Sequence, residues 1–257
     1  MSFFNLSEQM KAASMTSDKM TYHGYHRFYP LFIHTLVDVP NIKMLELGYQ
    51  NGYSIDLWTN YFNNPIIDAI DVLQDPNDNR LNKYFLLDQS KNSLLDDFVN
   101  NSETKYDFII DDASHVPDHQ WNTFIRFINI LKDGGIYIIE DVETSYWKRG
   151  EIFGYQFNAN KTSIFNRLKI IADFINYEFT TGDLVRKYKL SVIEAEALMQ
   201  IEMVTLGYNC IVIVKKDTAL FNDFYRTRNQ YRHTMKINRK DVSSFEKIKI
   251  FIRSLIK

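Results

Sequence analysis

The chain has 257 residues, of which 45% are hydrophobic, and its formal net charge is -2. That length suits a single α/β core, and the near-neutral charge excludes the global positive field with which many proteins attract nucleic acids. We therefore expect one folded domain whose partner is a small molecule and not a nucleic acid.

Two further features bound the environment of the protein. Cys210, the single cysteine, lies in an apolar run and cannot form an intramolecular disulfide, which is typical of a reducing compartment. The N-terminus lacks the pattern of a signal peptide, and no stretch approaches the roughly 18 apolar residues of a membrane span. We expect a cytoplasmic protein.

Apolar runs and helical stretches alternate along the chain. Runs with the length of buried strands occupy 43–47, 66–71, 106–111 and 135–140, and helical stretches occupy 54–62 and 119–131. This alternation predicts an α/β fold with a doubly wound, mostly parallel seven-stranded sheet, whose strands all end at one edge. Two last runs, at 201–206 and 209–215, flank a Gly-Tyr turn and predict an antiparallel C-terminal hairpin.

The chain divides into three segments by composition. We predict an N-terminal helical or lid segment at 1–40, a core domain at 41–216 with a helical insert at about 150–200, and a basic helical tail at 217–257. Residues 235–257 are amphipathic, so the tail is either a helix on a membrane surface or one docked on its own domain or a sister subunit. We favour docking, since most amphipathic helices cover a core.

A glycine-containing loop follows the first predicted strand. Gly48 and Gly52 stand between Glu46 and the next helix, and Asp71 ends the second strand. The spacing departs from the dinucleotide fingerprint, which argues against NAD or FAD. Although a tight turn alone would explain the glycine pair, Glu46 and an Asp71 placed to bind ribose hydroxyls favour a nucleoside site.

Carboxylates gather where the third and fourth runs end. Asp112, Glu140 and Asp141 are hard oxygen ligands of the kind that suit Mg²⁺ or Mn²⁺, and they repel one another unless a cation intervenes. His115, three residues after Asp112, is a suitable general base near pH 7. Helix capping is the alternative interpretation for each acid taken singly, but not for the cluster.

These two segments resemble the metal-dependent sugar O-methyltransferases of macrolide antibiotic biosynthesis, of the mycinamicin and tylosin type, and their relatives in surface-polysaccharide gene clusters. The resemblance rests on an Asp-Asp-small-Ser-His strand end at 111–115, a Gly-Gly pair at 134–135 and Glu-Asp-x-x-Thr-Ser-Tyr-Trp at 140–147. Weaker matches are Asp-Gln-Ser at 88–90 and Ser-Asp-Lys at 17–19. Tyr53 stands where the family usually has another glycine.

The resemblance implies a Rossmann-like class I methyltransferase fold that binds S-adenosylmethionine (SAM) and Mg²⁺ or Mn²⁺. It implies that Asp112, Glu140 and Asp141 hold the metal and that His115 is the base. The predicted cofactor-binding residues are Asp18, Lys19, Glu46, Gly48, Tyr49, Gly52, Ser54, Asp71, Asp88, Gln89, Ser90 and Asp111.

We accordingly expect an O-methyltransferase, in a homo-oligomer, that acts on a small-molecule acceptor. A nucleotide-linked, lipid-linked or free sugar is the first expectation, and a phosphoryl or phosphoramidate oxygen of a capsule or polysaccharide precursor is the second. Two alternatives stay open: a hydroxylase-like activity on the same scaffold, and a non-catalytic Rossmann-fold subunit of a biosynthetic complex. The second is disfavoured because the metal ligands and His115 are all present.

Overall fold

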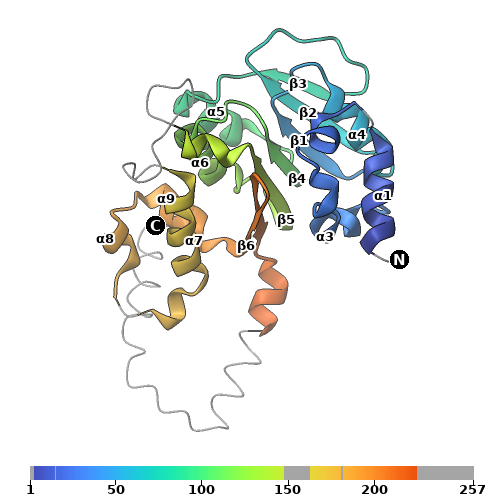
Figure 1. Ribbon diagram of the computed structural model, residues 1–257. Helices are drawn as coiled ribbons and strands as arrows, with labels where there is room; N and C mark the ends of the chain where they lie inside the picture. The colour runs from blue at the N-terminus through green and yellow to red at the C-terminus, as the bar shows by residue number, and fades with distance from the viewer. Residues whose placement is uncertain (1–2, 15, 148–162, 181, 225–257) are drawn as a thin grey trace.

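The computed structural model describes residues 3–14, 16–147, 163–180 and 182–224. Its strands form one seven-stranded sheet in the order β3-β2-β1-β4-β5-β7-β6 (Figure 1). The strands are β1 (Lys43–Leu47), β2 (Ile66–Asp71), β3 (Lys83–Leu86), β4 (Tyr106–Asp111), β5 (Leu131–Glu140), β6 (Ile201–Gly207) and β7 (Cys210–Lys215). The first five strands pair in parallel, while β7 is antiparallel to both β5 and β6. The predicted doubly wound sheet with its closing hairpin is confirmed.

Helices cover both faces of this sheet (Figure 1). On one face lie α1 (Phe3–Ala13), α3 (Pro30–Ile33) and α4 (Tyr53–Tyr61). On the other face lie α5 (Asn92–Asn101), α6 (Pro117–Phe127), α7 (Ile164–Ile175) and α9 (Val192–Met199). The shorter elements are α2 (Asp18–Thr21), α8 (Leu184–Tyr188) and the 3-10 helices η1 (Tyr25–Arg27), η2 (His34–Leu36), η3 (Val142–Tyr146) and η4 (Tyr177–Phe179).

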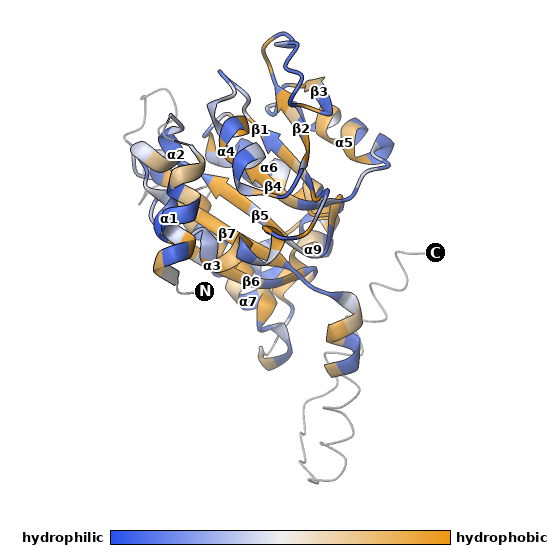
Figure 2. Cartoon of the chain, turned by 90° about the vertical axis from the view of Figure 1, so that its right-hand side faces the viewer, coloured by the Kyte–Doolittle hydropathy of each residue, from blue (hydrophilic) through white to orange (hydrophobic). Residues whose placement is uncertain are grey.

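Two hydrophobic cores result, one on each side of the sheet. Successive side chains of a strand point to opposite faces, so in β4 Phe108 and Ile110 enter the core beneath α1, α3 and α4, while Ile109 enters the core beneath α6. The central strands β4, β5 and β7 are apolar along most of their length (Figure 2), as expected for strands buried on both faces.

The structure corrects one pair of predicted boundaries. The helix predicted at 119–131 is α6, which begins at Pro117 and ends at Phe127, and the strand predicted at 135–140 begins at Leu131. The apolar run at 127–131 continues the helical pattern, but Leu131 pairs with Tyr106 in the sheet. The register between β4 and β5 then shifts, so that Phe108 pairs with Ile136 and the polar residues between Leu131 and Ile136 are not paired with β4.

The strand ranges predicted from the sequence do not include β3. β3 is a four-residue edge strand whose side chains are all at least partly exposed, so it lacks the apolar run of a buried strand. No helix within the described ranges is long and apolar enough to cross a membrane. The amphipathic stretch at 235–257 and residues 150–162 of the predicted insert lie outside the described residues.

Candidate active site at the strand ends

A cavity of about 630 Å³ opens where β1, β2, β4 and β5 end. Many of the predicted site residues line it, from both the cofactor and the metal sets. They are Asp18, Gly48, Tyr49, Ser54, Asp71, Asp88, Gln89, Asp112, His115 and Asp141. The remaining predicted residues do not line it, and all of them except the exposed Ser90 are buried. They are Lys19, Glu46, Gly52, Ser90, Asp111 and Glu140.

The loop after β1 requires its two glycines. Gly48 has a φ of +93°, and a Cβ there would lie 2.1 Å from the carbonyl oxygen of Asp112. Gly52 has a φ of +67°, and a Cβ there would meet the Tyr49 ring. The backbones of the β1 and β4 ends therefore approach one another more closely than any side chain allows.

Asp71, at the end of β2, holds this loop. Its Oδ2 accepts the backbone N–H groups of Tyr49 at 2.8 Å and Gln50 at 3.0 Å, and its Oδ1 accepts that of Leu73 at 3.1 Å. The carboxylate is thus fixed at the cavity wall with lone-pair capacity remaining for a hydroxyl donor.

The cavity wall near β4 is organised by Gln89. Its Nε2 donates to both oxygens of the fully buried Asp111, at 2.8 and 2.7 Å, and its Oε1 accepts the backbone N–H of Ser114 at 3.1 Å. Burial raises the pKa of Asp111 to about 6. The two hydrogen bonds to Asp111 hold the Gln89 side chain in place. Ser90 is exposed, and its backbone N–H donates to Asp88 at 2.9 Å.

Asp112, His115 and Asp141 form a group that could hold a metal ion. One ligand atom of each lies within 4.8 Å of the others, and Nε2 of His115 is 3.9 Å from Oδ2 of Asp141. His115 and Asp141 both have left-handed backbone conformations, with φ values of 53° and 52°. Such strain is kept where a fold holds side chains in a required place. Burial, then repulsion from Asp112, raises the pKa of Asp141.

Glu140 lies outside that group, in a buried layer beneath it. Its carboxylate pairs with the ammonium of Lys19 and accepts the Tyr29 hydroxyl at 2.5 Å. The same ammonium lies 2.5 Å from Oδ2 of Asp112 and 3.9 Å from Glu46. Burial alone lowers the pKa of Lys19, but the charges of Asp112 and Glu140 outweigh it, and the pKa is raised above its usual value.

Glu46 is fully buried rather than open to the cavity. It accepts the indole N–H of Trp58 at 3.0 Å, and burial raises its pKa to about 7. In this structure its carboxylate contacts Trp58 and Lys19, and its predicted role as a cofactor contact stays a prediction.

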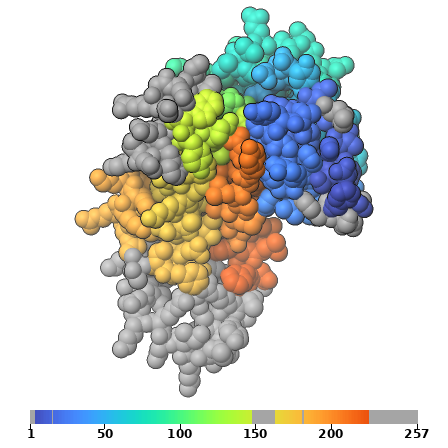
Figure 3. Space-filling model, in the orientation of Figure 1, coloured from blue at the N-terminus to red at the C-terminus, as the bar shows by residue number. Residues whose placement is uncertain are grey.

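Sequence reasoning missed two side chains that hold the acids, Tyr29 and Asn209, and gave no role to His23 and Tyr25. Oδ1 of Asp141 accepts the amide of Asn209 at 2.9 Å and the Tyr25 hydroxyl at 3.1 Å, and it lies 3.5 Å from Nε2 of His23. The rings of His23 and Tyr25 stack at 5.1 Å. The N-terminal segment thus lies against the closing hairpin (Figure 3). These two parts of the chain are far apart in the sequence, so no local sequence pattern predicts their contact.

Comparison with known proteins gives relatives of one kind. No family model matches the sequence. A tetracenomycin-C rhamnosyl 3'-O-methyltransferase from Streptomyces olivaceus is 30% identical over 185 residues, covering 66% of this chain and 45% of the relative. The mycinamicin VI 2''-O-methyltransferase of Micromonospora griseorubida is 25% identical over 169 residues, covering 62% and 42%.

Among solved structures, the MycE methyltransferase of the mycinamycin pathway, in complex with Mg and SAH, superposes with a TM-score of 0.67. It is 22% identical, and the match covers 82% of this chain and 54% of that one. The chain spans less than half the length of the curated relatives it matches. The sequence is thus similar to those of antibiotic-sugar O-methyltransferases, and the fold is the Rossmann-like fold of the MycE methyltransferase.

Proposed function

We propose that this chain transfers the methyl group of SAM to an oxygen atom of a small-molecule acceptor, with the help of a divalent metal ion. One observation supports the proposal: a single cavity at the strand ends is lined both by the glycine loop with Asp71 and by the group of Asp112, His115 and Asp141. A nucleoside site and a hard-cation site thereby share one wall.

The cavity suits a nucleoside-sized cofactor. Its volume of about 630 Å³ falls in the range of roughly 300–1,000 Å³ typical of small-molecule sites. Asp71 stands at the loop with capacity for ribose hydroxyls, and Asp18, Ser54, Asp88 and Gln89 supply further polar groups. These residues are the cofactor contacts that we propose.

The acids fit a cation. Asp112 and Glu140 already share one cation, the ammonium of Lys19, and Asp141 lies beside Asp112. We propose that Asp112, Glu140 and Asp141 hold Mg²⁺ or Mn²⁺, with the metal competing with Lys19 for the first two. Carboxylate oxygens are the donors that these ions prefer.

His115 is the proposed base. When bound, the metal ion lowers the pKa of an acceptor hydroxyl and stabilises the resulting oxyanion. Nε2 of His115 faces Asp141 across 3.9 Å at the cavity wall, where it can take the hydroxyl proton and hold it beside a carboxylate. The left-handed backbone at His115 fixes that orientation.

The acceptor we propose is a sugar, because the names of the relatives describe methylation of sugars carried by tetracenomycin and mycinamicin. For this chain we infer a free, nucleotide-linked or lipid-linked sugar of a polysaccharide or capsule precursor, methylated on a hydroxyl or on a phosphoryl or phosphoramidate oxygen.

Calorimetric titration with S-adenosylhomocysteine, with and without Mg²⁺ and with NAD as control, tests the proposal. We expect micromolar binding of the homocysteine nucleoside and none of NAD. An acceptor screen by methyl transfer then follows. Absence of nucleoside binding by folded, ligand-free protein would refute the methyltransferase proposal and favour the hydroxylase-like or non-catalytic alternatives.

A further inference from the structure

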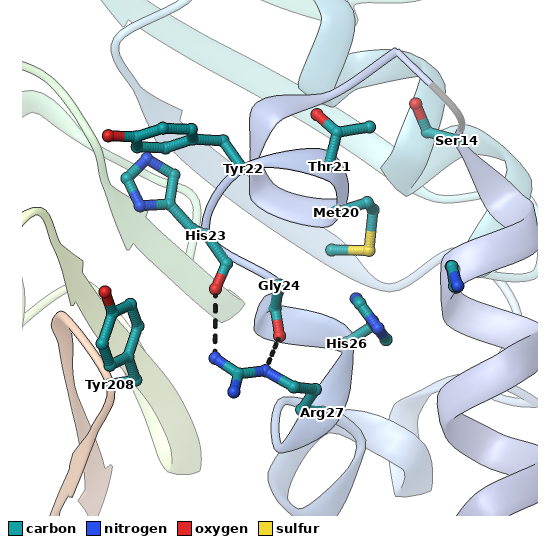
Figure 4. Close-up of a pocket in the computed structure, with 10 residues that line it drawn as sticks. Ser14, Met20, Thr21, Tyr22, His23, Gly24, His26, Arg27 and Tyr208 are labelled. Atoms are coloured by element: carbon teal, nitrogen blue, oxygen red, sulfur yellow. Dashed lines mark hydrogen bonds between the residues drawn. The ribbon is translucent and has the colours of Figure 1, made fainter.

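A second cavity, of about 700 Å³, lies between the N-terminal segment and the turn that joins β6 to β7 (Figure 4). The proposed cofactor and metal contacts make no use of it. Its lining residues are Lys11, Ser14, Met20, Thr21, Tyr22, His23, Gly24, His26, Arg27 and Tyr208.

Basic side chains converge on this cavity. Lys11, His23, His26 and Arg27 line it, and no acidic residue is among its described lining residues. Burial lowers the pKa of His26, and the charges of Lys11 and Arg27 lower it further, while Glu8 opposes them. Nδ1 of His26 is buried without a hydrogen-bond partner among the described residues. The site therefore offers the positive charges of Lys11 and Arg27 to an anion, with the His26 ring beside them.

Arg27 is held in place by the backbone. Its Nε donates to the carbonyl of Gly24 at 2.9 Å and its Nη2 to that of His23 at 3.3 Å, as the dashed lines of Figure 4 show. Its Cζ lies 5.4 Å from the centre of the Tyr208 ring. A guanidinium fixed in this way loses little further freedom when it binds a phosphate or carboxylate.

Two tyrosine rings at the cavity are largely exposed. Tyr22 is 83% exposed and Tyr208 is 67% exposed, although rings of this size are usually more buried. Each offers an apolar face and a polar hydroxyl, the combination that suits the ring of a sugar. In Figure 4, Arg27 lies between Tyr208 and His26.

The cavity adjoins the candidate active site through two of its walls. His23 lines the cavity, and its Nε2 is 3.5 Å from Oδ1 of Asp141. Tyr208, which also lines the cavity, precedes Asn209, whose amide donates to the same Asp141 oxygen at 2.9 Å. A molecule bound here therefore rests against residues that hold a proposed metal ligand.

We propose that this cavity binds an anionic sugar, with the phosphate or carboxylate on Arg27 and Lys11, beside His26, and the sugar ring against Tyr208 and Tyr22. That the bound molecule is the methyl acceptor rests on the proposed function, whereas the binding itself does not. The basic cavity selects acceptors that carry a negative charge.

The test is calorimetric titration of the full-length protein with α-D-glucose 1-phosphate, inorganic phosphate, glucuronate and the neutral methyl α-D-glucopyranoside. We expect glucose 1-phosphate or glucuronate to bind at least tenfold more tightly than the neutral glucoside, and the better of the two identifies the anion. Proton NMR of the six histidines follows the site directly, because the His26 resonance is expected to shift. Equal binding of charged and neutral sugars, or no binding of either anion, would overturn the proposal.

Two matched pairs of variants localise the binding. Arg27→Gln and Lys11→Gln are expected to weaken binding by about tenfold to a hundredfold, the effect of losing a charge-assisted hydrogen bond. Arg186→Gln and Lys169→Gln, at exposed positions on α8 and α7, should leave it unchanged. Unchanged binding in both cavity variants places the anion elsewhere and refutes the assignment.

S-Adenosylhomocysteine titration of the same variants separates the two proposals. If the nucleoside binds normally and the anionic sugars do not, only the sugar site fails. If the sugars bind at Arg27 and the nucleoside does not, the methyltransferase proposal fails and the sugar site stands.

Discussion

The two acid pairs at the strand ends divide between two environments. Asp111 and Glu140 are at most 1% exposed, whereas their neighbours Asp112 and Asp141 line the cavity. The strand ends explain the division, because Asp111 and Glu140 are the last residues of β4 and β5, whereas Asp112 and Asp141 follow where the chain leaves the sheet. In each pair, two adjacent acidic residues therefore lie in different environments.

The partners of the two layers differ as well. The buried acids are met by donors from the fold: Gln89 on Asp111, and Lys19 with Tyr29 on Glu140. The cavity acids face each other, His115 and the interior of the cavity. Under the proposed function, the buried acids shape the site and the cavity acids perform its chemistry. Lys19 joins the two sets, because its ammonium contacts both Glu140 and Asp112.

The largest expected effect separates Asp112 from Asp111. Asp112→Asn should weaken Mn²⁺ binding, followed by calorimetry, by more than the roughly 10–100-fold that loss of a residue supporting a metal ligand costs. Asp111→Asn retains an acceptor for Gln89 and should stay within that range. Equal losses of Mn²⁺ affinity in the two variants would mean that the cavity-facing Asp112 is no more important for metal binding than the buried Asp111.

Glu140→Gln tests whether a buried acid also serves the metal. Under the proposed function this variant weakens Mn²⁺ binding about as much as Asp112→Asn, because a ligand is lost. Mn²⁺ affinity within tenfold of the wild type would instead make Glu140 a partner of Lys19 and Tyr29 alone. His115 would then be the third group beside the two aspartates.

His115→Ala should reduce methyl transfer by roughly 10²–10⁴-fold, the usual contribution of a general base, while S-adenosylhomocysteine still binds. Turnover is measured with radiolabelled SAM and the acceptor found by the screen. His119→Ala is the matched control, since His119 lies in the same region with Nδ1 3.1 Å from the Ser114 hydroxyl. Full activity of His115→Ala would remove the base assignment.

Lys19→Met should destabilise the protein by about 3–5 kcal/mol, the cost of leaving buried charges without their partner. Urea unfolding without metal measures the loss, and added Mn²⁺ should recover part of it. Lys83→Met, at an exposed position on β3, is the control. A stability equal to that of the control would show that Lys19 does not balance the buried acids.

The sequence could identify the strands and the acids at their ends, because apolar runs and the Gly48 turn are local signals. It could not show that the first acid of each pair is buried and the second faces the cavity, since that depends on the backbone path after each strand ends. The place of Lys19 among the acids, and the contacts of Tyr29 and Asn209, depend on residues 68 to 121 positions apart. Such contacts arise only from the tertiary fold.

The smallest expected effect concerns Glu46 in the buried layer. Its pKa is about 7 in the folded protein against an ordinary value of 4.5, so the folded state favours the protonated form. The stability from this preference is present below pH 4.5 and is lost as the pH rises through about 7. Between pH 5 and pH 8 the wild type should therefore lose up to about 3 kcal/mol, at 1.36 kcal/mol per pKa unit, relative to Glu46→Gln. Glu202→Gln, at an exposed position, should keep the wild-type pH dependence in urea unfolding. Parallel pH profiles for the wild type and Glu46→Gln would show that Lys19 keeps Glu46 ionised in the folded protein.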